Sequence, residues 1–373
     1  MILKIKLIYM TKKKILIATG GTGGHIFPAL SLAKNLIKKN YDIMLTTDKR
    51  GLKYLSEIKE INLKKITSSP LVKKNIFRLI YSVFLICYST VKSFFLLSLN
   101  RPHMIIGMGG YSSFPVCIAA TILRIKFIIY ENNLIIGKAN KYLLCFAEKV
   151  FVSYKDLEGI KEKNKKKVIV VGNIIREEII EFNNYEDLKN KFDTINILVL
   201  GGSQGAKIFA EELPQVFKDL KESGIPLTVY QQCQTNQEDE LSKFYRDQNI
   251  KFEIFNFTNK ISDYYSKSNL VITRSGASAL GELINVKIPL IAIPLPTSAD
   301  NHQYINAKFY EKKGMCLLLE EKNISEDLYK LISFNFKDNT KFNSIISNQR
   351  QYSDKDVFNK LNLNIEKIIN EKN

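Results

Sequence analysis

Three glycine-rich turns, at residues 20–24, 107–110 and 201–205, follow apolar segments that are typical of β-strands. A turn that leads from a strand into a helix presents backbone N–H groups and the positive end of a helix dipole, which together favour a phosphate. The first and third turns lie about 180 residues apart, and each opens a half of similar size. The chain is therefore predicted to form two nucleotide-binding-type domains that face one another across a cleft.

Short apolar strands alternate with helical segments along both halves. This pattern predicts an α/β fold with parallel sheets covered by helices on both faces. Helices are expected at 28–38, from about residue 206 and from about residue 275. The predicted strands are 14–19, 41–46, 104–107, 126–130, 150–152, 167–171, 195–200, 227–231, 252–255, 270–273 and 290–293.

The domain boundary is predicted between residues 174 and 175, where a strand has ended before an acidic, Asn-rich stretch. The first domain then spans 12–174 and the second 175–349. Residues 350–373 form a charged amphipathic helix that is expected to pack back on the first domain. Residues 1–11 interleave Lys with apolar residues and lack the continuous apolar run of a secretory signal, so they are treated as an N-terminal extension.

The chain is strongly basic, with 55 Lys and Arg residues against 37 Asp and Glu residues and a formal charge of +18. The basic residues are spread along the chain without a recognisable nucleic-acid module, so nucleic acid is not expected as a partner. An anionic membrane surface or an anionic substrate fits the charge, as does a generally Lys-rich proteome. The five scattered cysteines and three histidines predict reduced cysteines in a cytoplasmic protein and no zinc site.

Residues 76–99 form the most hydrophobic segment of the chain. Its uncharged core, 79–91, has only 13 residues, whereas a membrane-spanning helix needs about 20, so a transmembrane segment is not predicted. Two interpretations stay open, an ordinary buried helix and a helix whose apolar face rests on a bilayer. The flanking basic residues favour the membrane slightly; they are Lys73, Lys74, Arg78 and Lys92.

The first glycine turn differs from the dinucleotide-binding fingerprint, because Ile26 stands where the third glycine would be. A dehydrogenase is therefore not expected. The turn instead carries the hydroxyl of Thr22 and the imidazole of His25 near the start of a helix. A helix N-terminus disfavours the cationic form of His25, which suits this side chain to act as a neutral base. The alternative is a histidine that only hydrogen-bonds the loop.

The third glycine turn is a candidate diphosphate site. Gly202, Ser203, Gln204 and Gly205 offer backbone N–H groups and a hydroxyl, and Arg176 is a candidate for a bidentate contact with the same phosphates. The alternative for the arginine is an ordinary surface position.

Residues 273–282 lead from a strand into a helix that Ser275 is expected to cap. Glu282 lies seven residues after Ser275, which is two helical turns on, so its carboxylate is suited to accept hydrogen bonds from ribose hydroxyls. The alternative is a solvated helix glutamate. The D-x-D pair of Asp354 and Asp356 lies in the C-terminal tail and is typical of a helix start. Neutralisation of a diphosphate by arginine and helix dipoles is therefore predicted, with no metal.

Seven motifs in order resemble one known family over residues 12–370. The chain is similar to the MurG family, the peripheral membrane N-acetylglucosaminyltransferases of peptidoglycan synthesis. The motifs that carry this resemblance are residues 20–28, 107–111, 130–133, 172–176, 201–206, 274–277 and 300–303.

The resemblance implies the GT-B fold, in which two Rossmann-like, doubly wound parallel-sheet domains face a central cleft. It implies transfer of N-acetylglucosamine (GlcNAc) from UDP-GlcNAc to the C4 hydroxyl of the muramoyl sugar of lipid I, an undecaprenyl-linked acceptor. The transfer inverts the anomeric centre and gives lipid II and UDP. No cofactor is implied, and the expected location is the cytoplasmic face of the inner membrane.

Residue roles also follow from the resemblance, position by position. His25 matches the residue proposed as general base, and Tyr111 and Glu131 lie on the acceptor side. The implied binding residues are Thr22, Gly23 and Gly24 at the donor sugar and phosphates, Asn133 at GlcNAc, Arg176 and Ser203 at the diphosphate, Glu282 at the ribose, and Gln303 with Ala277 at the sugar hydroxyls. Phe257 and Thr258 match the stretch that reads uracil, and Gly202, Gln204, Gly205, Ser275, Gly276 and His302 complete the predicted site.

The chain departs from the family pattern at a few positions. Tyr130 replaces a usual His and Asn132 a usual Gln, Thr258 replaces a usual Ile, and His302 stands where some members have Gln. None of these changes removes a charged anchor. Three rival functions stay open: a GT-B enzyme that glycosylates another membrane lipid such as diacylglycerol, a UDP-GlcNAc epimerase, and a membrane-surface binding protein without catalysis.

Overall fold

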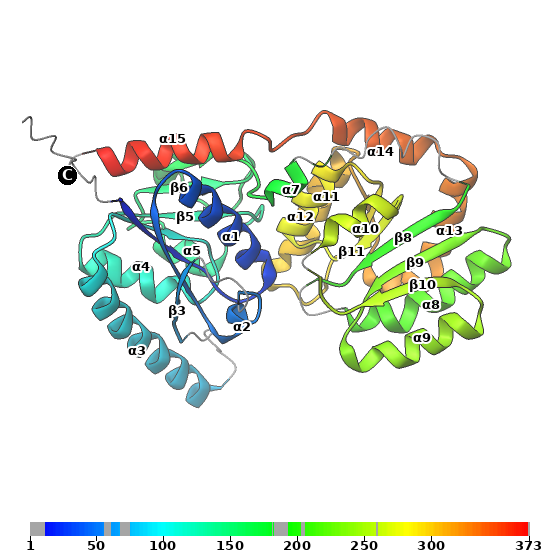
Figure 1. Ribbon diagram of the computed structural model, residues 1–373, viewed down its shortest axis with the longest axis horizontal. Helices are drawn as coiled ribbons and strands as arrows, with labels where there is room; N and C mark the ends of the chain where they lie inside the picture. Colours follow the sequence, from blue (N-terminus) through cyan, green and yellow to red (C-terminus); the bar gives the residue numbers. More distant parts are fainter. Residues whose placement is uncertain are drawn as a thin grey trace, which may run out of the picture.

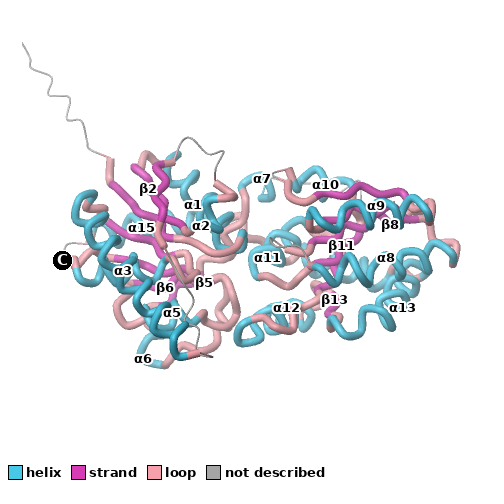
Figure 2. The backbone as a smooth tube through the Cα atoms, turned by 90° about the horizontal axis from the view of Figure 1, so that it is seen from below, coloured by secondary structure: helices cyan, strands magenta, loops and turns pink. Residues whose placement is uncertain are grey.

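The protein forms two α/β lobes in the computed structural model, each built around one parallel sheet (Figure 1). The structure describes residues 12–55, 61–67, 75–180, 182, 193–202, 206–258 and 260–371. The predicted N-terminal extension, 1–11, lies outside these residues. Figure 2 shows the strands at the centre of each lobe and the helices outside them.

The first lobe contains a seven-stranded sheet of order β3-β2-β1-β4-β5-β6-β7, in which every neighbouring pair is parallel. Its strands are β1 Lys14–Ala18, β2 Asp42–Thr47, β3 Asn62–Lys65, β4 Met104–Gly107, β5 Phe127–Glu131, β6 Lys149–Val152 and β7 Val168–Val170. Its helices are α1 Gly23–Lys38, α2 Lys49–Leu52, α3 Ile76–Asn100, α4 Ser113–Ile122, α5 Lys138–Leu143 and α6 Glu162–Lys165.

The second lobe repeats this plan with a six-stranded parallel sheet of order β10-β9-β8-β11-β12-β13. Its strands are β8 Ile195–Leu200, β9 Leu227–Gln232, β10 Lys251–Phe255, β11 Leu270–Thr273, β12 Leu290–Ala292 and β13 Leu317–Leu318. Its helices are α7 Glu177–Ile180, α8 Lys207–Glu222, α9 Glu238–Asp247, α10 Ile261–Lys267, α11 Ala277–Val286, α12 His302–Lys312, α13 Ile324–Lys337 and α14 Thr340–Arg350.

The predicted α/β architecture with two parallel sheets is confirmed. The apolar runs β1, β4, β8 and β11 are buried along almost their whole length, as strands covered on both faces must be. The sequence did not predict the strands β3 and β13, which have four and two residues. β3 is polar and mostly exposed, and β13 has only two residues, so neither presents the apolar run that indicates a buried strand.

The chain passes between the lobes at two places, residues 171–176 (the first crossing) and residues 351–356 (the second crossing). After the second crossing, α15 (Val357–Asn370) returns to the first lobe, whereas α14 lies on the second (Figure 1). Val357, Leu361 and Ile365 of α15 pack into the same apolar core as the strand residues Ile15 and Ile17. The C-terminal helix therefore fastens the end of the chain to its first domain.

Helix α3 differs from every expectation of a core helix. It buries only Ser82, Ser89, Ser93 and Leu97, which form the stripe that faces the domain. Most of its aromatic and aliphatic side chains are exposed, and Phe77 is 78% and Leu99 86% exposed. The interpretation as an ordinary buried helix is therefore wrong.

Helix α3 is also longer than its uncharged core of 13 residues suggested. Of the described residues, α3 alone is long and apolar enough to cross a membrane by length and composition. Its 25 residues exceed the 13 uncharged ones because the flanking charges fall inside the helix. The buried serine stripe nevertheless holds α3 against the first lobe along its length.

Candidate active site between the lobes

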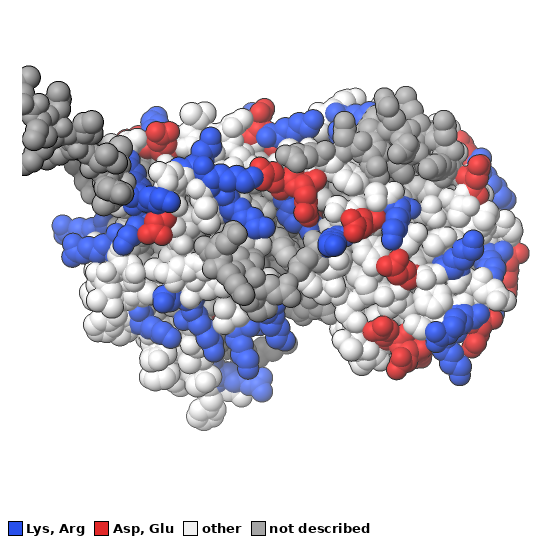
Figure 3. Space-filling view, in the orientation of Figure 1, with Lys and Arg blue, Asp and Glu red and all other residues white. Residues whose placement is uncertain are grey.

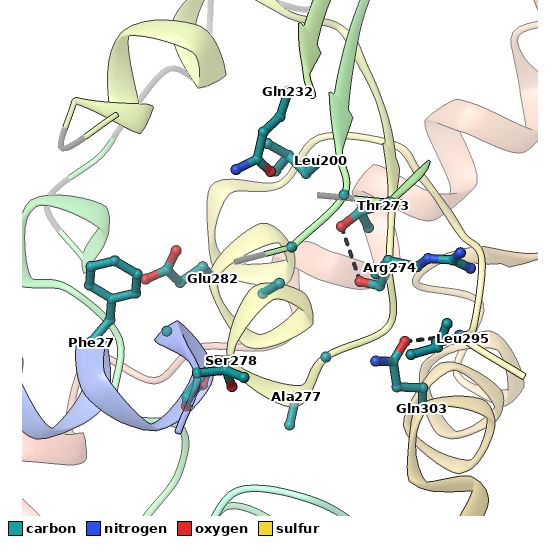
Figure 4. Close-up of a pocket in the computed structure, with 18 of the residues that line it drawn as sticks. Phe27, Leu200, Gln232, Thr273, Arg274, Ala277, Ser278, Glu282, Leu295 and Gln303 are labelled. Carbon is teal, nitrogen blue, oxygen red and sulfur yellow. Dashed lines mark hydrogen bonds between the residues drawn. The ribbon is translucent and has the colours of Figure 1, made fainter. Parts of the chain in front are cut away.

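A cavity of about 670 Å³ lies between the two lobes and is lined by residues from both. Figure 4 shows part of its wall, with Phe27 and Ser278 at the interface of the lobes. This volume falls in the range that holds a small ligand of nucleotide-sugar size. The predicted site residues that line it are Thr22, Gly23, Gly24, His25, Asn133, Arg176, Gly202, Thr258, Gly276, Ala277, Glu282, His302 and Gln303.

Three predicted site residues do not line this cavity. Glu131 and Ser275 are buried behind its wall, and Tyr111 is 38% exposed in the turn that precedes α4. Ser203, Gln204 and Gly205 lie outside the described residues. Ser275 was expected to cap a helix, but α11 begins two residues later at Ala277, with Gly276 as its N-cap. Ser275 consequently lies buried in the turn between β11 and α11 and not in the cavity wall.

His25 lies in the first turn of α1, because this helix begins at Gly23 and not at Pro28 as expected. Burial lowers the pKa of His25 below its ordinary value of 6.5. The negative charge of Glu131 and a hydrogen bond to the backbone of Met108 oppose this shift without reversing it. His25 is therefore neutral at physiological pH, as a general base requires.

Gly109 makes room for this imidazole. Its φ is +83°, and a Cβ at this position would lie 3.0 Å from Cε1 and 3.1 Å from Nδ1 of His25. Any other residue would be strained in this backbone conformation and would press on the imidazole. The glycine turn at 107–110 therefore leaves space for the imidazole of His25, which follows the turn at 20–24.

Pro28 changes the hydrogen bonding of the same helix turn. Proline has no N–H, so the carbonyl of Gly24, four residues earlier, loses its partner inside α1. That carbonyl instead accepts hydrogen bonds from Ser278 Oγ, 2.7 Å away on the second lobe, and from Asn132 Nδ2 at 3.3 Å. Asn132 also donates to Ser278 Oγ at 2.8 Å. The proline in the first motif therefore frees a carbonyl that ties the two lobes together.

Glu131 organises the loop after β5. Its carboxylate accepts hydrogen bonds from the backbone and side chain of Asn133, from the backbone of Gly137 and from Asn140 Nδ2, at distances of 2.8–3.1 Å. Asn306 on α12 then reaches across from the second lobe, donates to Asn133 Oδ1 at 3.2 Å and accepts from the backbone of Leu134 at 3.1 Å. Glu131 thus positions Asn133 rather than facing the cavity itself.

Arg176 and Glu282 meet at the cavity wall in a bidentate ion pair, with distances of 2.9 Å and 2.6 Å. Burial disfavours the charge of Arg176, but Glu282 outweighs this effect and raises the pKa of the arginine. Tyr265 hydrogen-bonds the same carboxylate. The guanidinium also lies 5.6 Å from the ring centroid of Phe27 on the first lobe. Arg176, predicted to bind the diphosphate, and Glu282, predicted to bind the ribose, are therefore in direct contact.

Aromatic rings continue this wall across the lobes. Phe27 of α1 stacks on Phe257 of the second lobe with ring centroids 6.2 Å apart, and Tyr54 lies 5.6 Å from the same Phe257 ring. Thr258, beside Phe257, lines the cavity, and its hydroxyl accepts a hydrogen bond from the backbone of Lys260 at 2.9 Å.

The loop before α12 shapes the other end of the cavity. Asp300 and Asn301 both adopt left-handed backbone conformations, with φ of 51° and 54°, which is a strained arrangement often found at functional sites. Gln303 Oε1 accepts a hydrogen bond from the backbone of Leu295 at 3.0 Å (Figure 4). His302 hydrogen-bonds the backbone of Ala299 at 2.7 Å. Gln303 and His302 therefore fix this loop in addition to lining the cavity.

The sequence interpretation missed several cavity residues. Arg274 is buried at the end of β11, forms an ion pair with Glu321 and donates to the carbonyls of Ile293 and Pro294. It lies 4.7 Å from the ring centroid of Phe209. The position of Arg274 directly after a buried strand could have indicated a site residue. Its partners Glu321, Ile293 and Pro294, however, are distant in the sequence.

The described residues contain no group of three or more His, Cys, Asp or Glu side chains that could hold a metal ion. Arg176, Lys207 and Arg274 line the cavity, and each forms an ion pair with at least one glutamate.

Two facing parallel-sheet lobes with glycine turns at a shared cavity are the architecture of the GT-B fold. The chain belongs to glycosyltransferase family 28, whose N-terminal domain matches residues 15–152 and whose C-terminal domain matches residues 196–361.

Named relatives agree with this family. The chain is 38% identical over 362 residues to the UDP-N-acetylglucosamine--N-acetylmuramyl-(pentapeptide) pyrophosphoryl-undecaprenol N-acetylglucosamine transferase of Pelagibacter ubique, covering 96% of this chain and 99% of that relative. It is 35% identical to the protein of the same name from Rickettsia bellii, covering 86% and 91%.

Solved structures agree on the fold. The crystal structure of Acinetobacter baumannii MurG matches with a TM-score of 0.77 at 24% identity, over 95% of this chain and 99% of that one. A putative UDP-N-acetylglucosamine 2-epimerase from Listeria monocytogenes matches with a TM-score of 0.69 at 14% identity, over 97% of each chain. The fold alone therefore does not separate the transferase from the epimerase.

Proposed function

We propose that this enzyme transfers GlcNAc from UDP-GlcNAc to the C4 hydroxyl of the muramoyl sugar of an undecaprenyl-diphosphate-linked acceptor, lipid I, and releases UDP and lipid II. The activity for which relatives that cover most of the chain are named supports the donor and the lipid-linked class of acceptor. The observation that carries the proposal is a single cavity shared by the neutral, buried His25 of one lobe and the Arg176–Glu282 pair of the other.

The reaction is an inverting displacement at the anomeric carbon of GlcNAc. The acceptor oxygen forms a bond to C1 while the bond from C1 to the UDP oxygen breaks, and the hydroxyl proton passes to a base. His25 is the proposed base, since burial keeps its imidazole neutral at the start of α1.

The leaving UDP gains negative charge as its bond to C1 breaks. Arg176 and the backbone N–H groups around Gly201 and Gly202 are the proposed stabilisers of this charge, together with the N-terminus of α8. Glu282 is proposed to hold the ribose and Gln303 the sugar. Because Arg176 and Glu282 bind each other, the donor has two ways to bind. Its ribose hydroxyls share the Glu282 carboxylate with Arg176, or its diphosphate replaces Glu282 as the partner of Arg176.

The exposed face of α3 is the proposed contact with an anionic membrane at the cytoplasmic face of the inner membrane. Phe77, Phe84 and Leu99 lie on this helix, each with most of its side chain exposed. Arg78 and Lys92 flank them. Figure 3 shows Lys and Arg side chains gathered on the lobe that carries α3, while the acidic side chains on this side are more frequent on the second lobe. Apolar and basic side chains on one helix suit an interfacial contact.

Transfer of radiolabelled GlcNAc from UDP-GlcNAc to a lipid I analogue in the presence of EDTA tests the proposal. Labelled lipid II with EDTA present is the expected result. A parallel reaction with diacylglycerol tests the alternative acceptor, and label found only there would overturn the cell-wall role. UDP-GlcNAc converted to an epimer without any acceptor would establish the epimerase instead. Donor binding without transfer or epimerisation would leave a binding protein.

A further inference from the structure

Asp354 joins the two crossings through one buried carboxylate. It lies in the second crossing and is 5% exposed. Its Oδ1 accepts hydrogen bonds from the backbone N–H of Asn173 at 3.0 Å and from the hydroxyl of Tyr352 at 3.2 Å. Its Oδ2 accepts from the side-chain amides of Asn173 at 3.1 Å and Asn285 at 2.8 Å. Asn173 belongs to the first crossing and Asn285 to α11, so one side chain holds three separate segments.

The chemistry of this cluster suits a carboxylate and opposes an amide. All four partners donate, and an amide at position 354 would place its N–H donors against an N–H group of Asn173 or Asn285 whichever way it was turned. None of the four partners carries a formal charge. Burial raises the pKa of Asp354, while the hydrogen bonds from Asn285, Asn173 and Tyr352 oppose the shift. A buried charge held by neutral donors is costly, and such a group is expected to have a use beyond packing.

Each segment that Asp354 holds carries a residue of the donor site close by in the sequence. Asn173 lies three residues before Arg176 in the first crossing. Asn285 lies three residues after Glu282, within one turn of α11. Asn285 also accepts a hydrogen bond from the backbone N–H of Asp354 at 3.0 Å, so the contact is reciprocal. The carboxylate therefore fixes the spacing between the segment of Arg176 and the helix of Glu282.

The packing at this point leaves no room for a shift. Gly281, next to Glu282, faces Asn173 so closely that a Cβ would lie 2.9 Å from its Cγ. The Asn173 side chain has no free direction in which to move, since Tyr154 donates to its Oδ1 at 2.9 Å while its amide reaches Asp354. The first crossing and α11 are thus in direct contact, and Asp354 locks their register.

We propose that Asp354 is a positioning residue of the donor site, whose carboxylate holds the first crossing against α11 so that Arg176 and Glu282 meet a nucleoside diphosphate in the correct geometry. The inference rests on the proposed function of that site. Asp354 itself lies behind the cavity wall and touches no substrate.

The test compares UDP affinity in Asp354→Asn with the affinity in Asp356→Asn. The control removes the same charge from an exposed position two residues later in the same crossing. Asp354→Asn is expected to raise the dissociation constant of UDP, measured by calorimetry, by about tenfold, because the amide leaves a buried donor of Asn173 or Asn285 without an acceptor and displaces the segments that carry Arg176 and Glu282. The KM for UDP-GlcNAc should rise in parallel, with the KM for the lipid acceptor unchanged. Asp356→Asn should match the wild type in both.

Gly281→Ala provides a second variant that keeps the carboxylate and pushes Asn173 away from α11. It is expected to reproduce the loss of UDP affinity. Unchanged UDP affinity in both variants would overturn the inference, as would a lower melting temperature with unchanged affinity, which is the result for a purely structural role. Wild-type protein that fails to bind UDP-GlcNAc would instead refute the proposed function, so the two failures are distinguishable.

Discussion

The same connection in the two lobes carries two different helices. Both sheets place their first four strands in the order 3-2-1-4, so the connection from β3 to β4 in the first lobe corresponds to that from β10 to β11 in the second. The first connection contains the 25-residue α3, which turns its apolar side chains outward. The second contains the seven-residue α10, whose Ile261 and Tyr265 are buried at the cavity wall.

This difference shows how one architecture was divided between two tasks. In the second lobe the connection lines the cavity with Ile261 and Tyr265, and Tyr265 forms a hydrogen bond with Glu282. In the first lobe the connection lines no part of the cavity between the lobes and adds an apolar surface on the outside. Helix α3 contributes Leu97 to the core, with Phe94 and Leu96 packed against it, while most of its other apolar side chains add to the surface of the lobe. Substitutions in each lobe should therefore impair different steps.

The largest effect is expected from His25→Ala in the first lobe. Loss of a general base typically lowers kcat by about 10²–10⁴-fold, while UDP binding, a task of the second lobe, should persist. Steady-state kinetics together with calorimetry of UDP binding check this. His103→Ala, at an exposed histidine of the same lobe, is the control. Weak donor binding in His25→Ala would make His25 a binding residue and blur the division between the lobes.

Arg176→Ala should have the next largest effect. Removal of a stabiliser of developing charge costs about 3 kcal/mol, or about 100-fold in kcat/KM. Glu282 is then left without its bidentate partner, which adds to the loss of UDP affinity. Arg246→Ala, at an exposed position of α9, provides the comparison. Wild-type kcat/KM in Arg176→Ala would exclude a contact with the diphosphate.

The double variant Phe77→Glu with Phe84→Glu tests the outward face of α3. The two side chains are 78% and 64% exposed, so the fold should persist. Binding to anionic phospholipid vesicles, measured by co-sedimentation, should weaken by about 30-fold, because partial insertion of each phenyl ring contributes about 1 kcal/mol of apolar burial. UDP affinity should not change. Phe334→Glu, on an equally exposed phenylalanine of the second lobe, should bind vesicles like the wild type.

A smaller effect is expected from Ser278→Ala, which removes the hydroxyl that joins the lobes at Gly24. Loss of the shorter of the two hydrogen bonds to the Gly24 carbonyl should cost about 1 kcal/mol, or about fivefold in the KM for UDP-GlcNAc. Ser266→Ala, an exposed serine of α10 with a local hydrogen bond only, is the matched control. An unchanged KM would show that this contact does not contribute to donor binding.

The smallest effect concerns pH. Burial lowers the pKa of His25, so the neutral base should persist below pH 6.5 and be lost only as the pH falls through the lowered value. The acid limb of the kcat profile is therefore expected below pH 6.5. A limb above this pH would contradict the neutral, buried state of His25. The same shift makes the folded state resist protonation, so acidification below pH 6.5 should also reduce stability.

Much of the fold was predictable because its signals are local. Buried parallel strands are short apolar runs, and each glycine turn follows one of them, so the strands β1, β4, β8 and β11 and the cleft between the lobes followed from the pattern. Most predicted binding residues consequently line one cavity. The predicted start of α11 was two residues too early. Serine is a common N-cap residue, so Ser275 was expected to cap the helix, but the N-cap is Gly276.

The amino-acid pattern alone was enough to predict two parallel-sheet lobes, their glycine turns and many of the residues that line the cavity. Tertiary structure alone decided that α3 stays exposed, that Gly24 bonds Ser278, 254 residues later, and that Arg176 pairs with Glu282, 106 residues later. It likewise decided that Asp354 lies beside Asn173, 181 residues earlier. The spacing of apolar residues indicates which side chains are buried, but it does not identify the distant residues that they contact. Those partners were fixed only when the two lobes packed against each other.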